Sequence, residues 1–301
     1  MIRRFVQGLI TLWVLSVVIF LLSRATGNPA DLLLPLEMGD VDRDRMLAAL
    51  GLDRPLYVQY LYFLTGALTG NLGTSIRMNT PVVELLFARL PNSAQLVAVA
   101  MAMAVFIALP LGVLAAVRRG TSVDRGAQML AVMGMAAPPF WVGLVLMQFV
   151  SVRTGLLPVS GMGSPQHYVL PAFCLGIFIV AGFVRLTRSS MLDVLDSEYV
   201  KLARIKGLSE RVIVWKHSFR NALIPVLSFA SVYFAQLIGG AIVVETVFAW
   251  PGVGRLSYEA IMGRDYPLLQ GVVILIGTIT IAVNLLVDIL YAYIDPRIRY
   301  G

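Results

Sequence analysis

The chain has 301 residues, of which 58% are hydrophobic and 14% are charged, and its mean hydropathy is +0.81. Ordinary soluble domains contain about 25% charged residues, so this composition excludes a water-soluble globular protein. The formal net charge of +7 comes from basic residues that are spread between apolar runs, which argues against a nucleic-acid partner. Most of the chain is therefore expected to lie in a lipid bilayer.

Six uncharged stretches predict membrane-spanning helices, because crossing a hydrocarbon core of about 30 Å takes roughly 20 apolar residues. In chain order they are Phe5–Leu22, Leu96–Val117, Met129–Val150, Tyr168–Val184, Ala222–Val244 and Leu268–Val287. The fourth stretch is short and needs flanking residues or a tilt. The sixth is expected to continue to Ile294, and Pro110 and Pro138-Pro139 are expected to interrupt the second and third.

The basic residues of the short loops predict the orientation, because cytoplasmic loops carry an excess of Lys and Arg. Fifteen basic residues fall on one side of the six spans, and only Arg153, Arg255 and Arg264 fall in the short loops of the other side. Both termini and the loop 185–221 are therefore predicted to be cytoplasmic.

The segment 24–95 must then face outward. Turn residues such as Gly51, Gly70 and Pro91 divide it, and three short amphipathic helices are predicted at Val41–Leu50, Pro55–Leu68 and Pro81–Leu90. This insertion is either a cap on the membrane surface or a docking site for an external partner. The predicted organisation is 1–23 for the N-terminus and first span, 24–95 for the insertion, 96–294 for the transmembrane core and 295–301 for the tail.

The chain shows no catalytic, metal or cofactor motif. It contains no Gly-x4-Gly-Lys-Ser/Thr phosphate loop, so ATP binding by this chain is not expected. His167 and His217 fall on opposite sides of the predicted membrane and cannot share a metal, and a single cysteine, Cys174, lies in an apolar run where it is expected to pack. An enzyme is therefore not expected.

Three polar residues in or beside the predicted spans are candidates for a pathway or gate, because intramembrane ionisable groups are functional suspects. Asn284 and Asp288 are four residues apart and share a helix face. They indicate either the proton or cation site of an ion-coupled carrier or a buried polar pair that holds the sixth span. Glu245 lies near the outer end of the fifth span, where it either lines an entrance or is merely interfacial.

The loop between the fourth and fifth spans is expected to form two short helices joined by Gly207. Ser197 and Ser209 are candidate N-caps, Gly207 is the expected left-handed residue after the first helix, and Pro225 lies where the fifth span would begin. Val200, Ala203 and Gly207 form a narrow apolar ridge, flanked by Lys201, Arg204 and Arg211. This ridge either enters a groove on a soluble partner or rests on anionic lipid headgroups.

The same loop resembles the coupling loop of ABC importer permeases, specifically the dipeptide/oligopeptide/nickel branch. Ala203, Gly207 and Pro225 match the family motif, while Lys201 and Phe219-Arg220 depart from its general form. These departures resemble the peptide branch, which typically carries a basic residue at the first position and a run like Arg220–Pro225. Five more segments resemble that branch in the expected order, so the resemblance covers essentially the whole chain: Gly51–Tyr60, Gly70–Ser75, Glu245–Gly254, Arg264–Pro267 and Asp295–Arg299.

This resemblance implies an all-α polytopic membrane protein with the type I ABC importer permease fold, six transmembrane helices and an extracytoplasmic helical insertion between the first two. It implies a B-type permease subunit of the bacterial plasma (inner) membrane that pairs with a second permease. Two ATPase subunits would bind ATP and Mg, and an extracytoplasmic solute-binding protein would deliver the substrate.

The implied ATPase-coupling residues are Lys201, Ala203, Arg204 and Gly207, with Arg211 and Trp215 as weaker supports. The implied substrates are dipeptides or oligopeptides, and nickel chelates or glutathione are alternatives within the branch. An ion-coupled secondary carrier that uses Asp288 is the alternative of another class.

Overall fold

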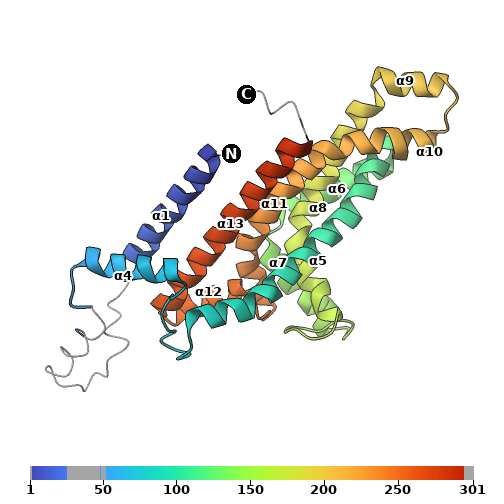
Figure 1. Cartoon of the computed structure of the whole chain (residues 1–301). Coiled ribbons are helices and arrows are strands. Elements are labelled where there is room, and N and C mark those ends of the chain that lie inside the picture. Colours follow the sequence, from blue (N-terminus) through green and yellow to red (C-terminus); the bar gives the residue numbers. More distant parts are fainter. Residues whose placement is uncertain (1, 26–47, 49–51, 295–301) are drawn as a thin grey trace. The chain divides into compact units, whose positions relative to one another are not determined.

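The computed structural model describes residues 2–25, 48 and 52–294, and helices dominate them (Figure 1). The predicted helix Val41–Leu50 and the motif Asp295–Arg299 fall mainly or wholly outside the described residues. The helices and the two π-helical segments η1 and η2 are α1 (Ile2–Ala25), α4 (Leu56–Thr69), α5 (Val82–Val117), α6 (Ser122–Ala136), α7 (Pro139–Leu146), η1 (Met147–Val152), α8 (Gln166–Leu195), α9 (Glu198–Ile205), α10 (Glu210–Val212), η2 (Ile213–Ser218), α11 (Phe219–Val247), α12 (Val253–Met262) and α13 (Tyr266–Ile294).

Four helices in the described part of the chain are long and apolar enough to cross a membrane, namely α1, α5, α8 and α13. A fifth span results if the pair formed by α6 and the helix after it is counted as one, although the two halves are bent by 104°. The 29-residue helix α11 covers the fifth predicted stretch. The helical membrane architecture is thus confirmed, whereas the number of six spans is not.

Prolines break the helices less often than the sequence predicted. Pro138 does separate α6 from α7, as predicted. Pro110 and Pro91, in contrast, lie inside the continuous helix α5, so the breaks predicted there are wrong. Pro225 does not mark the beginning of the fifth span, because it lies inside α11, which begins at Phe219. A proline removes one backbone donor, but helices in a packed bundle tolerate this because neighbouring groups satisfy the freed carbonyl.

The chain divides into two compact units, of which the first comprises Met1–Ser93 and Pro251–Leu285. In its described part, α12 and the start of α13 pack on the start of α5 through a buried cluster: Val82, Leu86, Val253, Leu256, Ala260, Leu268 and Val272. The helices α1 and α13 also approach closely, because a Cβ added at Gly277 would lie 2.5 Å from Leu15 Cδ2. Small residues at such contacts are typical of membrane helices.

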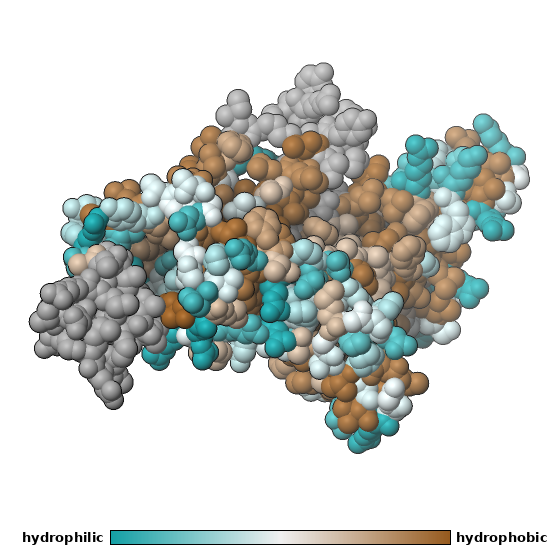
Figure 2. Space-filling view, turned by 60° about the horizontal axis from the view of Figure 1, so that its bottom comes forward, coloured by the Kyte–Doolittle hydropathy of each residue, from teal (hydrophilic) through white to brown (hydrophobic). Residues whose placement is uncertain are grey.

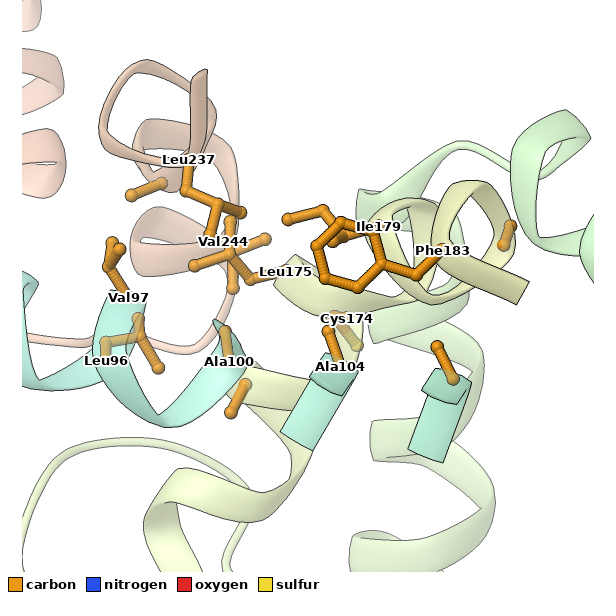
Figure 3. Packing of buried hydrophobic residues seen from close by; sticks show 14 of the residues in the cluster. Leu96, Val97, Ala100, Ala104, Cys174, Leu175, Ile179, Phe183, Leu237 and Val244 are labelled. Carbon is orange, nitrogen blue, oxygen red and sulfur yellow. The ribbon is translucent and has the colours of Figure 1, made fainter. Parts of the chain in front are cut away.

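The second unit comprises Ala94–Trp250 and Leu286–Gly301. Its core joins α5, α8 and α11. Figure 3 labels part of this cluster, namely Leu96, Val97, Ala100, Ala104, Cys174, Leu175, Ile179, Phe183, Leu237 and Val244. Cys174 is buried here, as predicted. A Cβ added at Gly112 of α5 would lie 2.6 Å from Thr187 Cβ of α8, so these two helices pack nearly backbone to backbone.

Candidate functional site

The loop between α8 and α11 forms an exposed end of the second unit. Figure 1 shows α9 and α10 at the end of the unit where α8 leads out and α11 leads back. The helix α9 is amphipathic and eight residues long, with Ser197 at its N-cap position. The Ser197 hydroxyl donates to Val194 O (2.5 Å) and so does not act as the predicted side-chain cap.

Gly207 ends α9 in a Schellman motif. Its φ is +78°, the left-handed region that glycine adopts without strain, as predicted. The Gly207 N–H donates to Arg204 O (2.9 Å) and the Leu208 N–H donates to Ala203 O (3.2 Å), which is the hydrogen-bond pattern of this motif. The glycine therefore fixes the direction in which the chain leaves α9.

Two ion pairs hold the charged residues of this loop. Lys201 Nζ lies 2.7 Å from Glu198 Oε1 within α9, and Arg204 Nε lies 2.8 Å from Glu210 Oε1 across the glycine turn. The hydrogen bond that Lys201 donates to Glu198 raises the pKa of Lys201, and the one that Arg204 donates to Glu210 raises the pKa of Arg204. Both basic groups are therefore charged at neutral pH, and the second pair closes the turn between α9 and α10.

The predicted apolar ridge faces inward, which corrects its orientation. Val200 is fully buried and Ala203 is 9% exposed. Both belong to a buried cluster with side chains from four other segments of the same unit: Val113, Ala116, Met191, Leu195, Ile213, Val214 and Ala222. Ala203 therefore packs α9 against its own subunit, and its side chain is not on the exposed face of α9.

A different set of apolar residues faces outward on α9 and the turn after it. The exposed fractions are 56% for Leu202, 81% for Ile205 and 41% for Leu208. Figure 2 shows hydrophilic and apolar surface side by side at the end formed by α9 and α10. With Lys201 and Arg204 also exposed, this outward face combines apolar area with positive charge.

The segment after the turn is one unbroken helix, not a separate helix followed by a span. The short helix α10 passes into η2 and then into α11 without a break. Asn221 Nδ2 of α11 donates to the hydroxyl of Tyr199 in α9 (2.8 Å). A displacement of α9 would therefore act on α11 through both the buried cluster and this hydrogen bond.

Arg211 and Trp215 lie on a groove, apart from the outward face of α9. The groove is lined by α5 on one side and by α10 and η2 on the other: Pro110, Val113, Leu114, Val117, Glu210, Arg211, Val214 and Trp215. The Trp215 ring packs edge-on against Phe219, with the ring centroids 5.3 Å apart.

The three pathway candidates do not form one site. Glu245 is fully buried near the end of α11, where its carbonyl accepts a hydrogen bond from Trp250 N–H (2.8 Å). Asn284 is exposed on α13, in the first unit, and the side chain of Asp288 lies outside the described part of the chain. No group of three or more metal-ligating side chains occurs within the described ranges.

Sequence reasoning missed a buried ion pair in the second unit. Arg188 of α8 donates to Asp124 of α6 through Nε (2.6 Å) and Nη2 (2.9 Å), and the carboxylate also accepts from Gly120 N–H (2.9 Å) and Gln128 Nε2 (2.8 Å). The side chain of Asp124 is 3% exposed. The pair joins the start of α6 to α8 about two turns before the end of α8, and nothing in the local sequence pairs these residues.

The sequence did not predict that the segments Gly70–Ser75 and Arg264–Pro267 meet in the first unit. Ser75 Oγ donates to Asp265 Oδ2 (2.5 Å), and the same carboxylate accepts from Arg77 N–H (3.2 Å) and from Leu268 N–H (3.3 Å) in the first turn of α13. Asp265 therefore caps α13 and ties it to the segment 75–77. Ser75 and Asp265 belong to two separate motifs, and neither motif indicates the other as its partner.

The comparisons with known proteins agree with this architecture. The chain is 39% identical over 311 residues to the oligopeptide transport system permease protein AppB of Bacillus subtilis (strain 168), covering 99% of this chain and 98% of that protein. It is 43% identical over 295 residues to the glutathione transport system permease protein GsiC of Salmonella choleraesuis, covering 97% of this chain and 96% of that protein.

A solved structure shares the fold at low sequence identity. The inward-facing MetNI methionine ABC transporter matches with a TM-score of 0.60 and 18% identity, over 70% of this chain and 96% of the matched chain. Two family models also match, the binding-protein-dependent transport system inner membrane component over residues 108–300 and the N-terminal component of the same systems over residues 1–97. The chain therefore belongs to the family of binding-protein-dependent transport system inner membrane components, as an ABC importer permease of the oligopeptide/glutathione type.

Proposed function

We propose that this permease forms half of the translocation pathway of an ATP-driven peptide importer, beside a second related permease. Two ATPase subunits bind the outward face of α9 from the cytoplasm, and an extracytoplasmic binding protein delivers the substrate. The excess of basic residues on one side supports cytoplasmic termini and a cytoplasmic loop 185–221. This chain supplies no nucleotide motif, so the driving force has to come from partner subunits that hold ATP and Mg.

One observation carries this proposal, namely the exposed apolar face of α9 on a helix that is fixed to its own subunit. Leu202, Ile205 and Leu208 present apolar side chains to solvent, which a partner subunit would cover. The opposite face packs in the buried cluster with α5, α8 and η2. A push on the outward face is therefore passed to the spans, as alternating access requires.

Peptides are the proposed substrate class. Two relatives that the chain covers almost fully are named for oligopeptide and for glutathione transport. Glutathione is the second candidate, because a glutathione permease is related to this chain to a similar degree, with 43% identity against 39% for the oligopeptide permease. Transport assays with a labelled dipeptide, a labelled tetrapeptide and labelled glutathione would separate these candidates.

Ile205→Asp is expected to uncouple the importer without unfolding this chain. Ile205 is 81% exposed, so the substitution should change stability by less than about 0.5 kcal/mol. Loss of a central apolar contact at an interface costs about 2 kcal/mol or more, which weakens binding about 30-fold. ATPase retained on the purified permease, and peptide uptake into vesicles that contain the complex, would measure the effect.

Leu156→Asp is the matched control, because Leu156 is 70% exposed but lies in the predicted external loop between η1 and α8. It should retain the ATPase as the unmodified chain does. Full ATPase retention and full uptake by the Ile205 variant would contradict the proposed docking face.

The Asp288→Asn variant is expected to keep ATP-dependent uptake of substrate. A carrier driven by protons through Asp288 would lose uptake on this substitution and on addition of an uncoupler, because its driving force is the ion gradient. The proposed importer should keep ATP-dependent uptake in both conditions. Uptake that stops with the uncoupler at constant ATP, and that does not need the ATPase subunits, would favour the carrier.

A further inference from the structure

We propose that the groove between α5 and η2 binds one anionic phospholipid, with its headgroup at Arg211 and one acyl chain along α5. The groove has a volume of about 400 Å³ and its floor is apolar. Val113 and Val214 are 2% and 5% exposed at its base, while Leu114, Val117 and Trp215 are 38%, 49% and 49% exposed along it.

The groove continues into an apolar stripe on α5. Phe106, Pro110, Leu114 and Val117 recur at spacings of three and four residues, so they lie on one face of this helix. All four are exposed, and Phe106 is 77% exposed. The helix rises about 16 Å from Phe106 to Val117, at about 1.5 Å per residue, which is about the depth of one leaflet of a ~30 Å hydrocarbon core. The stripe thus has the length that an acyl chain needs.

The charges at the mouth of the groove favour an anionic headgroup. Glu210 is paired with Arg204, whereas no acidic partner of Arg211 occurs among the described residues. Arg118 and Arg119 are exposed and directly follow Val117, the last residue of α5. A tryptophan beside basic residues at the end of a membrane-spanning helix marks the membrane interface. Basic pockets at this level bind phosphate-containing headgroups.

The charge also argues for a lipid rather than a protein segment as the occupant. An apolar stripe one leaflet deep that ends in positive charge complements a single molecule with an acyl chain and a phosphate. The leaflet in which that lipid lies follows from the proposed cytoplasmic position of the loop, but the groove itself does not depend on it.

Fluorescence of Trp215 in the reconstituted complex provides the test. The complex is placed in vesicles that contain increasing fractions of brominated phosphatidylglycerol or brominated phosphatidylcholine, and the Trp215 signal is the difference between the unmodified complex and one with Trp215→Phe. Half-maximal quenching is expected at a mole fraction of brominated phosphatidylglycerol that is at least tenfold lower than that of brominated phosphatidylcholine. Each basic residue near the membrane surface raises the affinity for an anionic lipid about fivefold.

Arg211→Gln should lower this preference about fivefold. Lys216→Gln, which removes an exposed cation of the same segment that does not line the groove, should leave it unchanged. Equal quenching by both lipids would overturn the proposal, because it would show ordinary boundary lipid. Absence of quenching by either lipid would also overturn it, because a protein partner would then cover the groove. The measurement uses neither uptake nor ATP hydrolysis, so it stands or falls separately from the proposed coupling role.

Discussion

Replacing Arg188 with alanine is expected to destabilise the second unit by about 3–5 kcal/mol, because it leaves the buried Asp124 carboxylate without its cationic partner. The two hydrogen bonds from Arg188, at 2.6 and 2.9 Å, would be lost together. Only the donors at Gly120 and Gln128 would remain. The effect would be measured by heating the purified complex and recording how much assembled permease remains at each temperature.

Arg185→Ala is the control for this prediction, because Arg185 is exposed on the same helix one turn away. It should change stability by less than about 0.5 kcal/mol. The double substitution Asp124→Leu with Arg188→Met should be less destabilising than the sum of the two single changes. The reason is that the double variant leaves no unpaired charge in the protein interior, whereas each single variant does. Additive effects, or an Arg188 variant as stable as its control, would show that the pair does not hold α6 to α8.

Ala203→Asp is expected to prevent correct folding of the loop, in contrast to Ile205→Asp two residues further on. Ala203 is 9% exposed and packs in the buried cluster, so a carboxylate there would be both oversized and desolvated. An unpaired buried charge costs several kcal/mol. For the Ala203 variant, protease cleavage of the loop should rise and the yield of assembled permease should fall. Both should stay normal for the Ile205 variant.

Ala203→Ser is the milder control, because it adds one small polar atom and should reduce assembly far less. Normal yield together with lost ATPase binding for Ala203→Asp would instead restore Ala203 to the partner-facing surface. The comparison of positions 203 and 205 thus tests the orientation of α9 directly.

The two faces of α9 explain why its orientation could not be predicted from the sequence. Val200 and Ala203 form one apolar strip, and Leu202 and Ile205 form another, on a helix of only eight residues. Local periodicity alone does not decide which strip is buried. Val200 is buried in a cluster that includes Val113 and Ala116 of α5, and these residues are distant from α9 in the sequence.

Features with local causes were predicted correctly. The left-handed Gly207 and the break at Pro138 follow from the backbone preferences of single residues. The pairs Asp124 with Arg188 and Ser75 with Asp265 could not be predicted, because each depends on the packing of helices far apart in the chain. Breaks at Pro91 and Pro110 were overpredicted for the same reason, since packing around α5 maintains a helix that an isolated segment would not keep.

The bond between Ser75 and Asp265 has a consequence for how the protein is made. The two residues are 190 positions apart, and the unit that they hold together is built from both ends of the sequence. At about 5–20 residues per second, a ribosome needs roughly 10–40 s to deliver the second partner after the first. During that interval the segment 75–77 of the nascent chain lacks the Asp265 carboxylate to which it binds. A truncated chain that ends before Asp265 would therefore leave this segment without its partner and is expected to be degraded.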